Sequence, residues 1–347
     1  MAQATPGSDH PKASPEAALS FLRRQMGPYG LLDSYVEDET DNSYTYDNAL
    51  AAMAFLCAGD IDSTRKVLDA FHMIDPQPEG GFLECYHART GKPNGILTAG
   101  PNAYLLQALN LYCVKTKDPR YNTLARKIAD YLLSLQDKNG GLFGRTAVTW
   151  KSTENNLGAY CAIHNLGVVQ KKRAYVKKAE KIHHFLLTEC WDGTRFVRGE
   201  KDPTVVTDVQ ALGAIVLGTD YAKGAYWAEE QTRVTVNYRE NTQVTGFDFN
   251  ADLDTIWAEG TLQEALAFLV TGDAAKSVYY KTEVEKLAHP SGALLLATNT
   301  GTTGIDWTLE PWQAVAPTAW YLFLSFKTNP LDLLTKQITR SSSEHAH

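Results

Sequence analysis

The chain has 347 residues, of which 44% are hydrophobic, so it can bury roughly three quarters of its unfolded surface. Its net charge of −7 and isoelectric point near 5.7 argue against a nucleic-acid partner, which would require a basic face. No run approaches about 18 consecutive apolar residues, so no membrane span is predicted.

The two ends of the chain are polar and irregular. We therefore expect a disordered leader at 1–13, a single domain at 14–330 and a C-terminal tail at 331–347. Residues 1–18 lack the layout of a signal peptide, so the protein either stays inside the cell or has lost a leader that would direct it to the periplasm or outside. The five cysteines form no CxxC or Cys/His cluster, so neither a disulfide framework nor a metal site is predicted, and we expect no cofactor.

Helical segments of two kinds alternate along the chain. The first helix is expected at 15–26, where Ser14 is the cap and Pro15 lies in the first turn. Nearly all-apolar segments are 44–60, 100–114, 152–167, 207–218, 255–272 and 311–328. Amphipathic segments follow the first five of these, at 61–74, 118–136, 173–190, 220–231 and 273–288.

The apolar segments recur every 51 to 55 residues when six first-turn positions are taken as equivalent, namely Asp47, Asn102, Glu154, Asp208, Glu259 and Trp312. Six helical hairpins at one period indicate a repeat architecture. We predict an all-α (α/α)6 toroid, with apolar helices inside amphipathic ones and the first helix pairing with the last. The alternative is an open superhelix of helix pairs, which would keep a tighter period and end in polar caps.

One segment departs from this pattern. Residues 233–250 alternate β-branched and polar side chains, which is typical of a β-hairpin. We expect a small insertion there, on the loop face before the fifth inner helix.

The first turns of the inner helices should meet around one mouth, together with the loops that precede them. Four carboxylates are expected there, Asp47, Glu154, Asp208 and Glu259. The aromatic and amide side chains expected to bind substrate are Tyr44, Tyr46, Tyr86, Asn102, Trp150, Asn155, Trp191, Trp257, Trp307 and Trp312. Aromatic faces suit stacking on sugar rings, and paired carboxyl groups suit the cleavage of a glycosidic bond.

Neighbouring inner helices should lie roughly 8–10 Å apart, so acids on adjacent helices can face one bond. Crowding raises the pKa of at least one carboxyl group, which can then remain protonated as a general acid. We assign Glu259 as the general acid and Asp208 as the base. Glu154 and Asp47 are substrate-binding groups or alternative catalytic carboxylates. Each acid alone also fits a plain helix-start charge.

The phrases YDNAL, STENNL, TDVQAL, WAEGT and APTAWYLF resemble those of (α/α)6-toroid glycoside hydrolases and related polysaccharide-processing enzymes. Glu259-Gly260 is similar to the Glu-Gly that carries the general acid in family-eight endoglucanases and chitosanases, although here it begins the fifth inner helix rather than the first. The resemblance implies hydrolysis of a poly- or oligosaccharide, with carbohydrate as the partner of a protein we expect to be a monomer.

Two other enzyme classes compete with this interpretation. LLSLQDKNGGLFG at 132–144 resembles the repeat of terpene cyclases and protein prenyltransferases, and Asp252-Leu253-Asp254-Thr255 is close to the proton-donating motif of class II cyclases. A Thr replaces its last Asp, however, and the zinc site of a prenyltransferase is missing. A polysaccharide lyase would recruit Tyr86, His87, Asn155 and Arg198, but an acidic mouth repels a uronate chain. A sugar- or protein-binding toroid without activity is the non-enzyme alternative.

Overall fold

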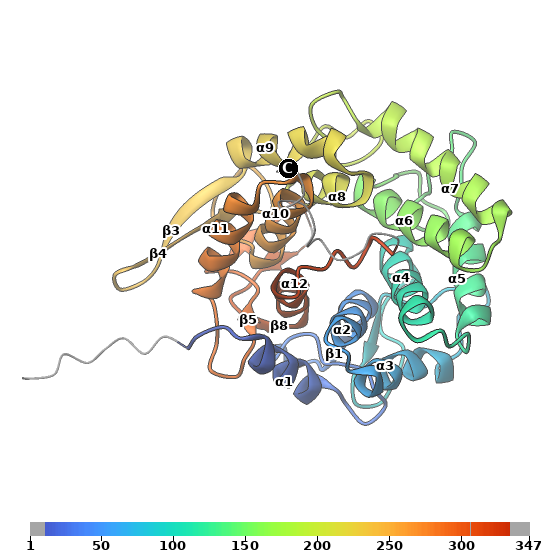
Figure 1. Ribbon diagram of the computed structural model, residues 1–347, viewed down its shortest axis with the longest axis horizontal. Coiled ribbons are helices and arrows are strands. Elements are labelled where there is room, and N and C mark those ends of the chain that lie inside the picture. Colours follow the sequence, from blue (N-terminus) through green and yellow to red (C-terminus); the bar gives the residue numbers. More distant parts are fainter. Residues whose placement is uncertain (1–10, 306, 334–347) are drawn as a thin grey trace, which may run out of the picture.

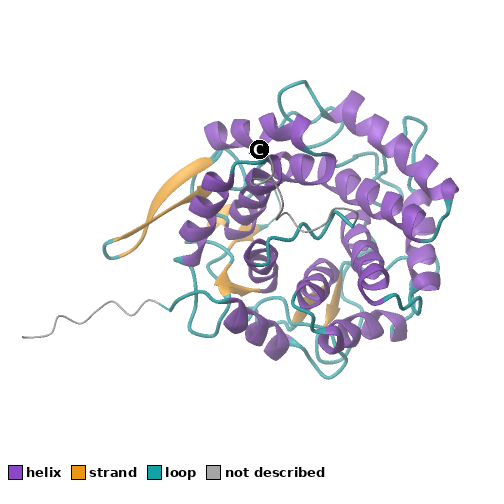
Figure 2. Ribbon diagram, viewed as in Figure 1, coloured by secondary structure: helices purple, strands orange, loops and turns teal. Residues whose placement is uncertain are grey.

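The computed structural model describes residues 11–305 and 307–333, and its helices form two concentric rings (Figures 1 and 2). The inner ring contains α2 (Thr45–Cys57), α4 (Ala99–Thr116), α6 (Thr153–Val169), α8 (Asp208–Leu217), α10 (Ala258–Thr271) and α12 (Val315–Ser325). The outer ring contains α1 (Pro15–Gln25), α3 (Ile61–Met73), α5 (Asn122–Ser134), α7 (Arg173–Phe185), α9 (Ala222–Gln231) and α11 (Ala274–Glu285). The predicted alternation of inner and outer helices is confirmed.

The inner ring is closed. Each inner helix contacts the next in chain order, and α12 contacts α2. The inner helices are buried almost all round, as their continuous apolar sequences require, whereas an outer helix such as α3 buries one face that includes Val67, Leu68 and Phe71. The fold is therefore the all-α (α/α)6 toroid, and the open superhelix is excluded.

A glycine marks the point where the ring closes. Gly292, in the loop after α11, has φ +89°, and a Cβ atom there would lie 2.2 Å from the carbonyl oxygen of Ala17 in α1. Only glycine combines this backbone conformation with so close an approach. The last outer-to-inner loop thus packs directly on the first helix.

The same hydrogen-bond device fastens all six outer-to-inner loops to the inner helices. In the first turn of each inner helix, a buried amide or hydroxyl oxygen accepts the backbone N–H of a residue in the preceding loop, at 2.7–2.9 Å. These side chains, here called the loop-fastening residues, are 51 to 57 residues apart in the sequence. They are Asn48, Asn102, Asn156, Gln210, Thr261 and Thr318. They define the repeat register, and the predicted register is wrong at three of its six positions. Relative to Glu154, Asp208 and Glu259, Asp47 is one residue and Asn102 two residues too late, and Trp312 is four residues too early and precedes α12.

The strands are short and lie in the connections. β1 (Asn42–Tyr44) pairs with β2 (Cys85–His87), β5 (Leu294–Leu295) with β8 (Gln313–Ala314), and β6 (Gly301–Thr302) with β7 (Thr308–Leu309). The predicted hairpin is confirmed as β3 (Arg233–Arg239) and β4 (Thr242–Phe247), which project from the rim of the ring between α9 and α10 (Figure 1).

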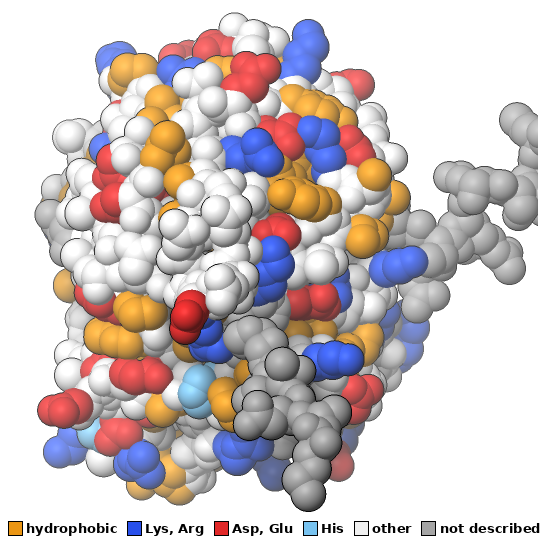
Figure 3. Space-filling view, turned by 90° about the vertical axis from the view of Figure 1, so that its left-hand side faces the viewer, with side chains coloured by type: hydrophobic (Ala, Val, Ile, Leu, Met, Phe, Trp, Pro, Cys, Tyr) orange, Lys and Arg blue, Asp and Glu red, His pale blue; other side chains and the backbone are white. Residues whose placement is uncertain are grey.

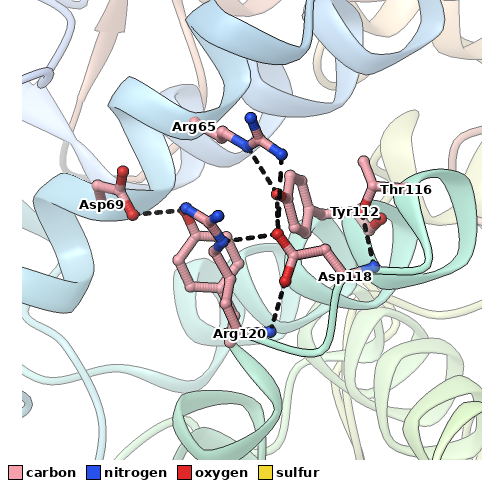
Figure 4. A network of polar contacts seen from close by, with 7 residues as sticks. Arg65, Asp69, Tyr112, Thr116, Asp118 and Arg120 are labelled. Atoms are coloured by element: carbon pink, nitrogen blue, oxygen red, sulfur yellow. Dashed lines mark hydrogen bonds and ion pairs between the residues drawn. The ribbon is translucent and has the colours of Figure 1, made fainter.

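Polar contacts also join helices at the opposite end of the ring, where inner helices lead into outer ones. Figure 4 shows Tyr112 of α4 accepting a hydrogen bond from Arg65 of α3 at 2.9 Å and donating to Asp118 at 2.8 Å. Arg120 bonds the same carboxylate at 2.7 Å. This network holds α3, α4 and the start of α5 together away from the mouth.

The chain that follows α12 crosses the centre of the ring (Figure 1). The carbonyl oxygen of Leu331 accepts hydrogen bonds from Gln107 at 3.2 Å and Asn165 at 3.1 Å, and the Leu331 side chain is buried. Asn329 bonds the carbonyl of Ile215 at 3.0 Å. The segment therefore plugs this end of the ring, and the boundary predicted at residue 330 falls inside it. Most of the predicted leader and tail, 1–10 and 334–347, lies outside the described residues.

The surface carries charged side chains of both signs (Figure 3). Acidic and basic side chains are interspersed over the face shown in Figure 3, without a continuous basic patch. Among the described helices, none combines the length and the apolar character that crossing a membrane requires.

Candidate active site

Three of the predicted acids occupy one equivalent position. Glu154, Asp208 and Glu259 each lie two residues before the loop-fastening residue of their helix, and Tyr46 lies at the same position in α2. Two residues correspond to roughly 200° of helix rotation, so when the fastening residue faces the loops, the residue two before it faces the inside of the ring. The fold thereby directs three carboxyl groups and one phenol into the same space.

This space is a cavity of about 340 Å³, here called the inner chamber. All four predicted carboxylates, on α2, α6, α8 and α10, line it. The lining residues are Tyr35, Tyr46, Asp47, Gly100, Pro101, Tyr104, Glu154, Asn155, Asp208, Leu212, Phe249, Trp257, Glu259, Gln263, Ile305 and Trp307. Acidic groups inside aromatic walls are the composition expected from the sequence.

A second cavity of about 510 Å³, here called the outer chamber, adjoins the first and shares Glu154, Asp208, Phe249 and Ile305 with it. Its other walls include Trp150, Lys151, Arg198, Glu200 and Asp202. The two chambers are neighbours, and Glu154 and Asp208 line both of them.

A directed chain of hydrogen bonds holds Glu259. The indole Nε1 of Trp320, which can only donate, bonds the Tyr46 hydroxyl at 3.3 Å, and Tyr46 donates to Glu259 Oε1 at 2.5 Å. Gln263 Nε2 also bonds Glu259 Oε1, at 3.2 Å. Because both donors meet Oε1, the proton of the neutral acid resides on Oε2.

Burial raises the pKa of every carboxyl group in the cluster, but to different extents. It raises the pKa of Glu259 to about 8, with the Tyr46 hydrogen bond opposing and nearby carboxylates reinforcing the shift. Burial and the neighbouring Asp208 raise the pKa of Glu154 to about 8. Burial raises the pKa of Asp47 to about 7, and that of Asp208 only to about 6, because backbone N–H groups, including that of Val209, stabilise its charge. Asp208 is thus the first of the four to ionise.

The structure brings together half of the side chains predicted to bind substrate. Tyr46, Asn155, Trp257 and Trp307 line the inner chamber, and Trp150 lines the outer chamber. Trp150 and Trp307 are 49% and 44% exposed, so both residues are accessible to a ligand.

Tyr44 and Trp312 lie one layer behind the lining. Both pack edge-on against Tyr35, with ring centroids 6.1 and 5.7 Å away, and Tyr35 itself faces the chamber. They support the wall rather than form it.

Three predicted substrate-binding residues lie elsewhere, and that prediction is corrected. Both polar atoms of the buried Asn102 amide bond the backbone of Phe82, at 2.7 and 2.8 Å, so this residue fastens a loop. Tyr86 is fully buried with its hydroxyl bonded to the N–H of Leu83. Trp191 packs on Phe196 and Tyr221 and lines neither chamber.

Several lining residues were missed. Tyr35 and Phe249 come from loops, for which the helical periodicity gives no information. Gln263 was detectable, because it lies four residues after Glu259 and therefore on the same helix face.

Most residues of the competing enzyme classes lie outside the two chambers, although Asn155 lines the inner chamber and Arg198 the outer one. Asp252 and Asp254 line neither chamber. They are exposed and lie beside the buried Asp248, with one oxygen of each carboxylate within 4.8 Å of the others. Among the described residues, this is the one group of three or more His, Cys, Asp or Glu side chains placed closely enough to hold a cation. Tyr86 and His87 lie in β2, outside both chambers.

No protein-family model matches the sequence, and no curated protein matches it either. The structure is similar to that of a glycosidase variant in complex with glucose, with a TM-score of 0.71 and 13% identity over 92% of this chain and 96% of that one. A bacterial glucoamylase complexed with acarbose aligns with a TM-score of 0.70 and 13% identity, over 91% of this chain and 55% of the other. A family 76 glycoside hydrolase from a bovine Bacteroides thetaiotaomicron strain aligns with a TM-score of 0.62 and 14% identity, over 90% and 77%. These likenesses establish the shared toroid fold.

Proposed function

We propose that the protein is a glycoside hydrolase that cleaves a poly- or oligosaccharide by paired-carboxyl catalysis. The observation that carries the proposal is the inner chamber, where four carboxyl groups from four helices meet with separated pKa values. Glycosidic cleavage requires one carboxyl group that stays protonated and one that is ionised. The fold, which the solved glycosidases share, supports this choice.

In the proposed reaction, Glu259 is the general acid and Asp208 the base. Glu259 donates the proton of Oε2 to the glycosidic oxygen as the bond from C1 to that oxygen breaks. Asp208 takes a proton from the water whose oxygen becomes attached to C1. The overall change adds one water across the bond, with H on the leaving sugar and OH on C1. The hydrogen bonds of Tyr46 and Gln263 to Oε1 direct the acidic proton into the chamber.

Glu154 is the alternative acid. It lines both chambers, and its pKa is raised to the same value as that of Glu259. In this alternative, Glu259 positions the sugar whose C1 atom reacts.

Leaving-group dependence separates the two assignments and tests the hydrolase itself. The wild type, Glu259→Gln and Glu154→Gln are assayed on neutral gluco- and manno-oligosaccharides of α and β linkage and on the matching aryl glycosides. Glucosides belong in this panel because the similar solved enzymes were captured with glucose and acarbose. The acid variant should lose about 10²–10⁴-fold in kcat on the oligosaccharide, yet far less on a dinitrophenyl glycoside, which departs without protonation.

A carboxylate outside the cleft provides the control. Asp69 accepts a hydrogen bond from Tyr121 on the outer ring, and Asp69→Asn should keep wild-type kcat. If the wild type releases no sugar from any member of the panel while retaining sugar binding, the protein is a binding module and the proposed hydrolysis is contradicted.

A further inference from the structure

The two chambers differ in whether their polar groups have hydrogen-bond partners within the protein. Three side chains of the inner chamber, each at least 95% buried, carry a polar atom without a hydrogen-bond partner. These atoms are Asp47 Oδ2, Trp257 Nε1 and Gln263 Oε1. Leaving a buried polar group unsatisfied costs about 1–3 kcal/mol, so three on side chains that line one cavity indicate a ligand toward which these side chains turn to complete their hydrogen bonds.

In the outer chamber the strongest polar groups are already paired. Lys151 bonds Asp137 at 2.7 Å and Asn139 at 2.9 Å, and forms an ion pair with Glu200 at 3.0 Å. Arg198 bonds Asp202 at 2.6 Å. What this chamber offers a ligand is mainly the exposed Trp150. Stacking on an indole face tolerates many sugars, whereas the inner chamber requires hydroxyls at set positions.

The unpaired atoms fit a sugar with free hydroxyl groups. A hydroxyl can donate to the carboxylate of Asp47 and to the amide oxygen of Gln263, and it can accept from the indole of Trp257. A ligand that bears a carboxylate is disfavoured, because four acidic side chains already surround the space. At about 340 Å³ the chamber is near the lower end of ligand cavities, which run from about 300 to 1,000 Å³.

Two tyrosines that contact each other form part of the wall of the inner chamber. The rings of Tyr46 and Tyr104 pack edge-on with centroids 4.6 Å apart, and the Tyr46 hydroxyl is bonded to Trp320 behind it. A polysaccharide cannot pass between these two rings, and the segment after α12 plugs the far end of the ring.

We propose that the inner chamber holds one neutral terminal sugar with unsubstituted hydroxyls, and that the enzyme therefore removes single residues from a chain end. This inference rests on the proposed hydrolysis. The ring that reacts at C1 must lie among the four carboxyl groups, so the terminal residue is the non-reducing one. The remainder of the chain leaves past Glu154 and Asp208, which line both chambers, into the outer chamber and toward Trp150.

The first test compares linear neutral hexasaccharides, labelled at the reducing end, with counterparts whose terminal non-reducing hydroxyls are blocked by a 4,6-O-benzylidene group. The inference predicts monosaccharide and labelled pentasaccharide as the first products, and at least a tenfold lower rate on blocked chains. Early products from mid-chain cleavage, or equal rates on blocked and free chains, overturn the inference and leave the hydrolase intact.

The second test does not depend on turnover. The monosaccharides of the panel are titrated calorimetrically into the wild type, Asp47→Asn and Trp257→Phe, which removes the indole donor and keeps an aromatic ring. One of these sugars should bind the wild type, and loss of one hydrogen bond should weaken it about five- to tenfold. Trp227→Phe is the matched control, because that indole packs on Arg195 at the outer ring. If no sugar binds, or if Trp257→Phe and Trp227→Phe bind alike, the chamber assignment is overturned, whether or not the enzyme hydrolyses.

Discussion

Two buried glutamines on inner helices illustrate the difference between the two ends of the ring. Gln107 of α4, at the plugged end, donates to the carbonyls of Pro330 and Leu331 and accepts from Asn165. Gln263 of α10, at the chamber end, donates to Glu259, but its Oε1 has no partner. Both side chains are almost completely buried. The chain completes its own hydrogen bonds at one end and leaves them incomplete at the other, where a ligand can supply them.

This comparison predicts that substitutions at the chamber end change kinetics, and after the catalytic acid and base themselves the largest such effect should come from Tyr46→Phe. It removes the 2.5 Å bond to Glu259 Oε1 and leaves Trp320 Nε1 without its acceptor. Loss of one such directing donor should lower kcat about 10²-fold, or roughly 2.7 kcal/mol. The pKa of Glu259 should also rise, because the lost bond had lowered it. Unchanged kcat would show that Tyr46 does not position the acid.

Substitutions at the plugged end should change stability instead. Asn165→Leu removes the bonds to Gln107 Oε1 and to the Leu331 carbonyl, both buried. The free energy of unfolding should fall by about 2 kcal/mol, measured by urea denaturation, with kcat/KM within twofold of wild type. A large kinetic loss with unchanged stability would contradict the division between the two ends.

The pH profile of kcat/KM sharpens the assignment within the chamber. Asp208 must be ionised, so activity rises through its pKa of about 6, and Glu259 must be protonated, so activity falls through its pKa of about 8. We expect a bell-shaped profile with its maximum near pH 7, on either side of which kcat/KM falls about tenfold per pH unit. The two apparent pKa values belong to the interacting carboxyl groups together, so replacing Glu154 by Gln should shift both of them. A profile flat from pH 5 to 9 would contradict the pairing.

The smallest expected effect concerns Glu264, which lies in α10, as Glu259 and Gln263 do, but lines neither chamber. Its two oxygens are buried and unpaired, and burial raises its pKa well above the ordinary 4.5. The folded state therefore keeps a proton that the unfolded chain releases above pH 4.5, so this group lowers stability as pH rises. Glu264→Met should raise the free energy of unfolding by about 1 kcal/mol, and by more at pH 8 than at pH 5. A loss of stability at both pH values would contradict this explanation.

The fold was predictable because the alternation of apolar and amphipathic helices recurs six times, and periodicity alone indicates an inner and an outer ring. The carboxylates were predictable because each begins a helix whose position in the ring was already known. The exact register was not: Asn102 and Glu154 both lie in first turns, yet one fastens a loop while the other faces the inside of the ring. Which residue faces a loop and which faces the inside of the ring is determined by the hydrogen bonds to the loops, and the sequence does not reveal these.

Contributions from outside the repeat were also hidden in the sequence. Tyr35, Phe249 and Ile305 come from irregular segments, whose side-chain directions follow from tertiary packing. The plug formed after α12 was unpredictable for the same reason, because the polar residue Asn329 and the apolar Leu331 show no helical or strand period.

Turnover and binding measured together on Asp208→Asn test the central claim most directly. With a neutral oligosaccharide that the wild type hydrolyses, the variant should bind within about threefold of wild type by calorimetry and lose at least about 10²-fold in kcat. That result would identify the chamber-end carboxylate as the base of a glycoside hydrolase. A variant that hydrolyses the substrate at the wild-type rate would contradict the account.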